Sequence, residues 1–211
     1  MAGVMNLPKG KNDRNTKCTG PVCIPYSNQE AVRNLVSYVT GTGSRADKGE
    51  VIWYETFGLD PNPQLAIMQI EKTQEIFGLA EQGERKAYHL LYTIPNKEFQ
   101  RIGYNLDWIK QYAIQIGTTF YQRGFHNVVA IHDNYILNKY MQNFGPDEER
   151  FHFHIFVSNI SMYTARRLNF TRADRWREQE QFQNAVNMAV ECCPVQFNRV
   201  EIICEKMYGQ C

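Results

Sequence analysis

Two histidines placed two positions apart in an apolar run constrain the fold of this chain more than any other feature. The run covers residues 151–157 and contains His152 and His154. Because residues i and i+2 of an extended strand point to the same face, the two imidazoles are predicted to stand side by side. A second strand-like run ends at His132. If these strands pair, the three histidines complete a site for one divalent ion with a position open to a ligand.

Ordinary packing is the alternative interpretation of each histidine. It would explain one half-buried histidine well. Three histidines on two apolar strands are harder to explain in this way, because an unpaired buried imidazole costs stability. The pattern therefore favours a metal site. His126 lies six residues before His132 and would share its strand face, either as an outer neighbour of the site or as an exposed residue at the strand start.

The length and composition of the chain predict one domain. With 211 residues, of which 43% are hydrophobic, the chain can bury one substantial core. Residues 1–25 are polar and lack apolar periodicity, so we expect a flexible N-terminal arm followed by a domain over residues 26–211. The absence of a long apolar stretch and of a signal-peptide centre predicts a cytoplasmic protein without membrane insertion. A net charge of +1 restricts any nucleic-acid-binding surface to a local patch.

Apolar periodicity predicts a mixture of strands and helices. The expected strands cover residues 51–57, 87–94, 125–132 and 151–157, and the expected helices cover residues 28–40, 64–82, 105–123 and 171–190. The buried side of the second helix is expected to hold Leu65, Met68, Ile76 and Leu79. Strict β-α-β alternation is missing. The order therefore predicts a single-domain α+β fold, with a central antiparallel sheet that carries the metal histidines and is flanked by helices.

Several motifs occur in an order that resembles a known family. They are Tyr88-His-Leu-Leu-Tyr-Thr93, Val128-Val-Ala-Ile-His-Asp133 and His152-Phe-His-Ile-Phe-Val-Ser-Asn159. In this order they resemble relaxases, the mobilisation nucleases of the histidine-hydrophobic-histidine class. The segment 163–177 is similar to the region after this motif in the VirD-like and MobP-type branch, and the segment 31–39 is similar to the helix that carries the nucleophilic tyrosine. The resemblance covers roughly residues 28 to 180, and the histidine triad is its specific part.

The resemblance implies a bacterial enzyme of plasmid or conjugative-element mobilisation. Such an enzyme nicks one DNA strand at an origin of transfer and keeps the 5′ phosphate on a tyrosine, which would be Tyr38. It implies that His132, His152 and His154 bind a divalent metal ion, Mg²⁺ or Mn²⁺. Single-stranded origin DNA is the implied substrate, and relaxosome accessory proteins and a coupling protein are the implied protein partners.

Other residues have implied roles around this centre. The catalytic candidates besides the tyrosine are Glu98 and Asp133, and the candidates for supporting the metal ligands are His89, His126 and Asn159. The predicted contacts to DNA phosphates are basic residues in two groups, Arg45 with Lys48, and Arg166, Arg167 and Arg172. Interspersed aromatic residues (Tyr163, Phe170 and Trp176) would offer stacking faces to bases, although packing of Trp176 in the core is an equally good interpretation.

The chain departs from the family pattern at two places. An acidic residue usually follows the first metal histidine after one intervening position, where this chain has Asn134 and carries Asp133 one residue earlier. An asparagine is expected four residues after the last histidine, but Ser158 stands there and Asn159 follows. These departures suggest a shifted set of residues around the metal ligands.

Three alternative functions fit parts of the pattern. A rolling-circle replication initiator or transposase shares the chemistry, but its tyrosine generally follows the histidine pair, as Tyr163 does here. A catalytically silent accessory protein that binds single-stranded DNA would explain the departures at Asn134 and Ser158. A small metal-dependent oxygenase also uses strand histidines, but this chain lacks the regular His-x-Asp spacing.

Overall fold

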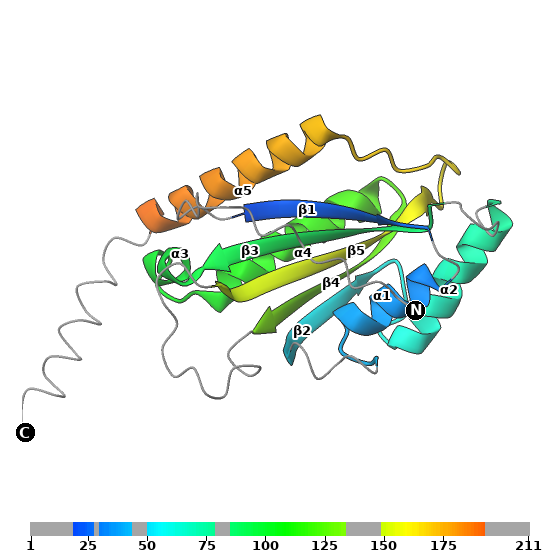
Figure 1. Cartoon of the computed structure of the whole chain (residues 1–211), viewed down its shortest axis with the longest axis horizontal. Coiled ribbons are helices and arrows are strands. Elements are labelled where there is room, and N and C mark those ends of the chain that lie inside the picture. The colour runs from blue at the N-terminus through cyan, green and yellow to red at the C-terminus, as the bar shows by residue number, and fades with distance from the viewer. Residues whose placement is uncertain (1–18, 28–29, 44–49, 79–84, 134–148, 193–211) are drawn as a thin grey trace, which may run out of the picture.

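A five-stranded antiparallel sheet forms the centre of the computed structural model (Figure 1). The structure describes residues 19–27, 30–43, 50–78, 85–133 and 149–192. The strand order is β1-β3-β5-β4-β2, and each neighbouring pair is antiparallel. The bounds are β1 Thr19–Tyr26, β2 Glu50–Phe57, β3 Ala87–Pro95, β4 Phe125–Asp133 and β5 Glu149–Ser161. The predicted α+β class with a central antiparallel sheet is confirmed.

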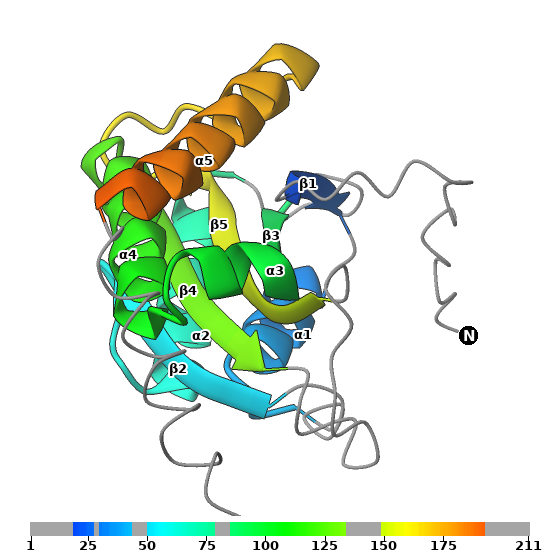
Figure 2. The same ribbon diagram turned by 90° about the vertical axis from the view of Figure 1, so that its left-hand side faces the viewer.

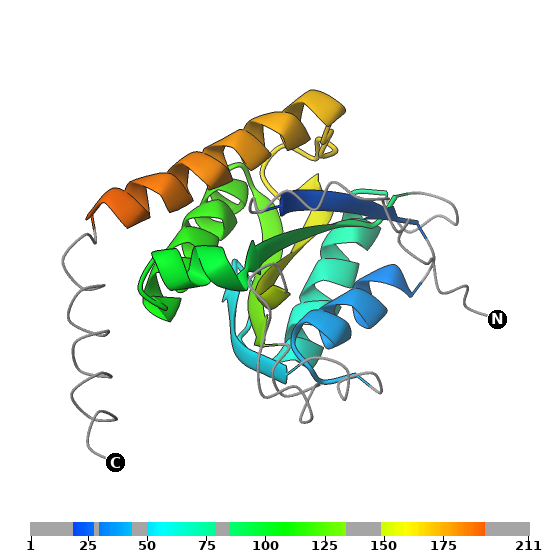
Figure 3. The same ribbon diagram turned by 60° about the vertical axis from the view of Figure 1, so that its left-hand side comes forward.

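Helices cover both faces of this sheet. Their bounds are α1 Ala31–Val39, α2 Pro63–Ile76, α3 Asn96–Arg101, α4 Leu106–Gln122 and α5 Arg172–Cys192. Figures 2 and 3 show α1 and α2 on one side of the sheet and α4 and α5 on the other. Because both faces are covered, all nine residues of β4 are buried.

Successive side chains of β5 point to opposite faces of the sheet and contribute to two separate hydrophobic cores. Phe153 and Ile155 belong to the larger core, which α4 and α5 cover, whereas Phe156 belongs to the core beneath α1 and α2. Since side chains alternate between faces, His152 and His154 share the face of Phe156. The metal histidines therefore lie in the covered sheet face, beside the smaller core.

Strand β1 corrects the predicted N-terminal arm. Residues 19–25 are part of a strand whose Thr19 and Tyr26 lie opposite Thr93 and Ala87 of β3. Residues 1–18 lie outside the described part of the chain. Gly20 and Pro21 predict a flexible segment because both residue types weaken strands. An edge strand tolerates proline, since one of its sides has no partner strand.

Helix α2 corrects a predicted buried face. Asn62 caps the helix, because its side chain accepts hydrogen bonds from the backbone N–H groups of Gln64 and Leu65. Ala66, Ile67 and Ile70 are the apolar residues that it buries. The predicted face is wrong for three positions, since Leu65 is 46%, Met68 63% and Ile76 65% exposed. The fourth position, Leu79, lies outside the described residues. The helix therefore has two apolar faces. The face with Ala66, Ile67 and Ile70 packs on the core, and the face with Leu65 and Met68 is exposed.

Candidate metal centre

Strand register brings the three predicted metal histidines together. His132 on β4 lies directly opposite His152 on β5, and His154 lies opposite Ala130. One candidate ligand nitrogen from each histidine lies within 4.8 Å of those of the other two. The prediction that these strands pair and gather the three imidazoles is confirmed. Metal binding itself stays a prediction.

Hydrogen bonds orient two of the three imidazoles. His132 Nε2 lies 2.9 Å from the carbonyl oxygen of Val39. A carbonyl can only accept, so this nitrogen carries the ring proton and Nδ1 keeps its lone pair. On His154, Nδ1 lies 2.7 Å from Nε2 of His89. One ring nitrogen of His132 and one of His154 then remain to be satisfied.

Three ring nitrogens of the cluster fit a divalent cation. They are His132 Nδ1, His152 Nδ1 and His154 Nε2, and each is buried without a hydrogen-bond partner among the described residues. Buried polar atoms without partners are costly. Since each of the three histidines brings one ring nitrogen within 4.8 Å of the other two, one shared ligand would satisfy such atoms. Imidazole nitrogens are good ligands of first-row divalent metals. The donor set therefore suits a metal ion held by three histidines.

Tyr38 of α1 lies against the same cluster. Its ring centroid is 5.3 Å from that of His154, 5.8 Å from that of His132 and 6.0 Å from that of His89, with the rings meeting edge to face. Tyr38 is half-buried, so one part of its ring packs on the histidines while another part meets solvent. The predicted nucleophile and the predicted metal ligands thus come from separate segments and meet at one site.

The end of α1 is fixed to the sheet next to Tyr38. Val39 is fully buried, and its carbonyl accepts the hydrogen bond of His132. Gly41 then ends the helix with φ of +71°, and a Cβ at this position would lie 2.8 Å from Cγ2 of Val51. The turn that carries Tyr38 is therefore held by one histidine of the cluster and by close packing on β2.

Burial keeps the clustered histidines neutral. Loss of hydration, together with a smaller effect of repulsion from His132, lowers the pKa of His89 to about 4 and that of His152 to about 3. Burial also lowers the pKa of His154 well below its usual value, as does the proximity of His89. For His132, burial lowers the pKa while the hydrogen bond to Val39 opposes that shift. Neutral imidazoles are the form that binds metals.

The metal-free protein should lose stability as the pH falls below about 6.5. The unfolded chain binds protons on its histidines with the ordinary pKa near 6.5, whereas the folded chain binds them only near 4 for His89 and near 3 for His152. The unfolded state thus takes up more protons in this window, and each histidine contributes a slope of up to about 1.4 kcal/mol per pH unit.

Chemical denaturation with a chelator present, at about pH 7 and about pH 5, measures this loss. His152→Asn should reduce the dependence on pH, because the variant lacks one of the protonating groups. An unfolding free energy that is unchanged between the two values would contradict the neutral state of the buried cluster.

The two predicted catalytic carboxylates are not part of the histidine group. Neither Glu98 nor Asp133 belongs to the set of close ligand atoms. Asp133 lies opposite Phe151, one residue after His132, so strand alternation directs it to the opposite sheet face. Glu98 is buried in α3 and its carboxylate accepts from Nη1 of Arg101 at 2.7 Å. A catalytic role for either residue gains no support from this placement.

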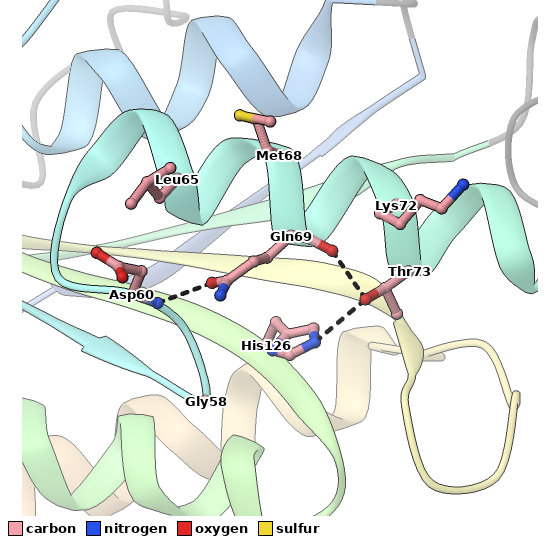
Figure 4. Close-up of a pocket in the computed structure, with 8 residues that line it drawn as sticks. All are labelled: Gly58, Asp60, Leu65, Met68, Gln69, Lys72, Thr73 and His126. Atoms are coloured by element: carbon pink, nitrogen blue, oxygen red, sulfur yellow. Dashed lines mark hydrogen bonds between the residues drawn. The ribbon is translucent and has the colours of Figure 1, made fainter.

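His126 lies in a separate place, which corrects its predicted role. It lines an open pocket of about 480 Å³ between α2 and the segment after β2 (Figure 4). Its Nε2 lies 3.4 Å from the hydroxyl oxygen of Thr73. The six strand residues from His126 to His132 span roughly 20 Å. This separation shows that His126 does not adjoin the metal histidines. Because the residue is 6% exposed, it is not an exposed residue at the strand start either.

Asn159 supports the sheet at a distance from the cluster. Its side-chain amide donates to the carbonyl of Arg85 at 2.9 Å, and its backbone N–H donates to the carbonyl of Lys86. It lies five positions after His154 along β5, which corresponds to roughly 17 Å of strand. The prediction that Asn159 supports a metal ligand is therefore wrong, whereas the structure does place His89 beside His154.

The predicted DNA contacts are only partly described. Arg45 and Lys48 lie outside the described residues. Arg166 and Arg167 are exposed just after the end of β5, and Arg172 is exposed at the start of α5. An isolated antiparallel β-bridge between Ile160 and Arg167 holds the segment after β5 against the sheet. Since the metal histidines lie near the start of β5, Arg166 and Arg167 lie away from the histidine cluster.

Two aromatic side chains accompany these arginines. Tyr163 and Trp176 are each 61% exposed, so the interpretation of Trp176 as a core residue is wrong. Phe170 is half-buried and packs against Tyr88, with ring centroids 6.4 Å apart. The exposed arginines Arg166, Arg167 and Arg172 with Tyr163 and Trp176 are called the arginine-aromatic surface below.

The comparisons with known proteins returned no matching family model and no matching curated protein. The resemblance to relaxases therefore rests on the sequence motifs alone. None of the described helices combines the length and the hydrophobicity that a membrane span requires.

Proposed function

We propose that the protein is a metal-dependent transesterase that nicks single-stranded DNA, with Tyr38 as nucleophile. The observation that carries this proposal is the packing of the Tyr38 ring against His154 and His132, two members of the three-histidine group. A group that gathers three imidazole nitrogens without a carboxylate would leave a bound ion its full double charge. Such an ion stabilises the charge that develops on a phosphate during displacement.

In the proposed reaction the phenolic oxygen of Tyr38 attacks a backbone phosphorus. The phenol gives up its proton to solvent as the new bond to phosphorus forms, the bond from phosphorus to the 3′ oxygen breaks, and the 3′ oxygen takes a proton from solvent and leaves as a hydroxyl. The 5′ phosphate stays on the tyrosine. Storage of the phosphoester bond in this form permits later rejoining without another energy source. The packing of Tyr38 on the cluster and the attachment of Val39 to His132 support this assignment, because they hold the nucleophile beside the place where a phosphate would bind.

The position of the tyrosines favours a relaxase over a replication initiator or transposase. Among the described residues that follow His154, the one tyrosine is Tyr163. The seven strand residues from His154 to Ser161 span roughly 23 Å, so Tyr163 lies far from the cluster. Tyr38 precedes the histidines and packs on them. This arrangement supports Tyr38 over Tyr163 as the nucleophile. The resemblance to relaxases extends the proposal to mobilisation of a plasmid or conjugative element in the bacterial cytoplasm, with origin DNA, relaxosome accessory proteins and a coupling protein as partners.

The three histidine ligands also indicate which metal ion the site would prefer. Imidazole nitrogens favour borderline transition ions, whereas Mg²⁺ prefers oxygen ligands. Because the described group contains three histidines and no carboxylate, we propose Mn²⁺ over Mg²⁺ as the ion. The same absence weakens the oxygenase alternative, since two histidines and one carboxylate form the usual iron site of that class.

A covalent-adduct assay tests the proposed function. The protein is incubated with Mn²⁺ and a pool of random single-stranded oligonucleotides that carry a fluorescent label at the 3′ end. Because the 5′ phosphate stays on tyrosine, the labelled 3′ fragment should migrate with the protein on a denaturing gel. Cleavage without an adduct would indicate a hydrolytic nuclease, and the absence of cleavage at any metal concentration would favour the silent accessory protein.

Replacement of Arg166 and Arg167 by Ala should weaken DNA binding without slowing chemistry. The two side chains belong to the arginine-aromatic surface, away from the histidines. Each lost phosphate contact on single strands should reduce the slope of log affinity against log salt by about 0.7. Fluorescence anisotropy across a salt series measures the slope, and Lys110→Ala on α4 serves as the control. A loss confined to one DNA sequence would show instead that these residues recognise bases.

A further inference from the structure

His89 adds a fourth imidazole beside the three candidate ligands. It lies on β3, opposite Phe156 of β5, and is 6% exposed. Its ring stacks on that of His154, with centroids 4.8 Å apart and an interplanar angle of 24°. The distance of 2.7 Å between His89 Nε2 and His154 Nδ1 is that of a hydrogen bond. One proton therefore lies between these two nitrogens.

The direction of this hydrogen bond determines which His154 nitrogen can bind a metal. If His89 donated, neutral His154 would carry its own proton on Nε2, which is buried and has no acceptor among the described residues. If His154 donates from Nδ1, its Nε2 keeps a lone pair. The second arrangement moves the other buried N–H group to Nδ1 of His89. Because a metal ion can bind His154 Nε2 in the second arrangement alone, the direction of the hydrogen bond follows from the proposed metal site.

The neighbouring ligand candidate follows the same rule. The carbonyl of Val39 takes the Nε2 proton of His132, so the lone pair of His132 is on Nδ1. In both residues one ring nitrogen makes a hydrogen bond while the other is buried without one. The backbone carbonyl of Val39 thus orients His132 on β4, and the imidazole of His89 orients His154 on the adjacent strand β5.

We propose that His89 is a positioning residue, which accepts the Nδ1 proton of His154 and so presents His154 Nε2 to the metal ion. This inference rests on the metal-binding part of the proposed function. Metal-bound histidines usually donate their second N–H group to a carboxylate, a backbone carbonyl or water. A neutral imidazole in that place adds no negative charge, so the bound ion would attract a phosphate more strongly than beside a carboxylate.

Nitrogen NMR of the metal-free protein tests the tautomer directly. Long-range ¹H–¹⁵N spectra distinguish a protonated from an unprotonated ring nitrogen, and the signals of His154 are assigned by their loss in His154→Gln. The inference predicts a protonated Nδ1 and an unprotonated Nε2 on His154. A protonated Nε2 would overturn it, whether or not the protein binds a metal.

Two substitutions of His89 test its effect on metal affinity. His89→Gln keeps an acceptor oxygen near the place of Nε2, whereas His89→Leu removes the acceptor and leaves the His154 N–H buried. By titration calorimetry with Mn²⁺, the leucine variant should bind about 10- to 100-fold more weakly, and the glutamine variant should stay within about threefold of the unmodified protein. Leu90→Val, which alters a core residue on the other face of β3, controls for lost stability.

The outcomes separate this inference from the proposed function. If the unmodified protein binds Mn²⁺ and His89→Leu binds it equally well, the role of His89 is refuted while the metal site stands. If the unmodified protein binds no metal, the proposed function fails, and the tautomer spectrum still decides the direction of the hydrogen bond. If the leucine variant does not fold, that spectrum and the glutamine variant provide the test.

Discussion

Tyr38→Phe should abolish the covalent DNA adduct while metal binding and folding are retained. The substitution removes one oxygen and keeps the ring that packs on His89, His132 and His154. Because that oxygen is the proposed attacking atom, the rate of adduct formation should fall by at least about a thousandfold. The measurement is the yield of labelled adduct over time on a denaturing gel.

Tyr163→Phe is the matched control for this prediction. It removes the same atom from the exposed tyrosine beyond the end of β5 and should leave adduct formation unchanged. Equal adduct yields from Tyr38→Phe and the unmodified protein would exclude Tyr38 as the nucleophile. Loss of the adduct in Tyr163→Phe alone would point to the replication-initiator alternative.

Replacement of His152 and His154 together by Ala should remove the metal ion and the nicking activity. They are two of the three histidines whose ligand nitrogens lie close together, and each has one buried ring nitrogen without a hydrogen-bond partner among the described residues. Loss of metal ligands should lower the affinity for Mn²⁺ by more than about a hundredfold for each residue. The fold should persist, because the sheet forms by strand pairing and does not depend on the ion.

Calorimetry with Mn²⁺ and circular dichroism measure these two effects. His126→Ala is the control, since it removes a buried histidine that faces Thr73 and lies outside the cluster. Unchanged metal stoichiometry in the double variant would show that the ion binds elsewhere. A parallel loss of metal binding in His126→Ala would mean that the affinity reports general damage to the fold.

The sequence predicts the histidine cluster well because strand geometry is regular. A spacing of two residues determines that His152 and His154 share a face, and pairing of two apolar strands is enough to add His132. Local spacing holds no information on the partner of each ring nitrogen. The carbonyl of Val39 orients His132 across 93 positions of the chain, and any residue type supplies such a carbonyl.

Local composition predicts the wrong structure where the environment of an element outweighs it. Residues 19–25 contain glycine and proline, yet they form an edge strand because β3 offers a free edge for pairing. In α2 the apolar residues Leu65 and Met68 are exposed, since the neighbouring stripe with Ile67 and Ile70 fills the space beneath the helix. His126 is on the predicted strand but lies too far from His132 to act with it. These outcomes depend on tertiary packing, which periodicity does not report.

Mass spectrometry of the covalent adduct tests the central claim most directly. Trypsin should release Tyr38 in the peptide of residues 34–45, in which it is the one tyrosine. With Mn²⁺ and single-stranded DNA, this peptide should carry a nucleotide through a 5′-phosphate ester on Tyr38, and the modification should be absent with a chelator. A nucleotide on any other residue, or an adduct that forms equally without metal, would contradict the account.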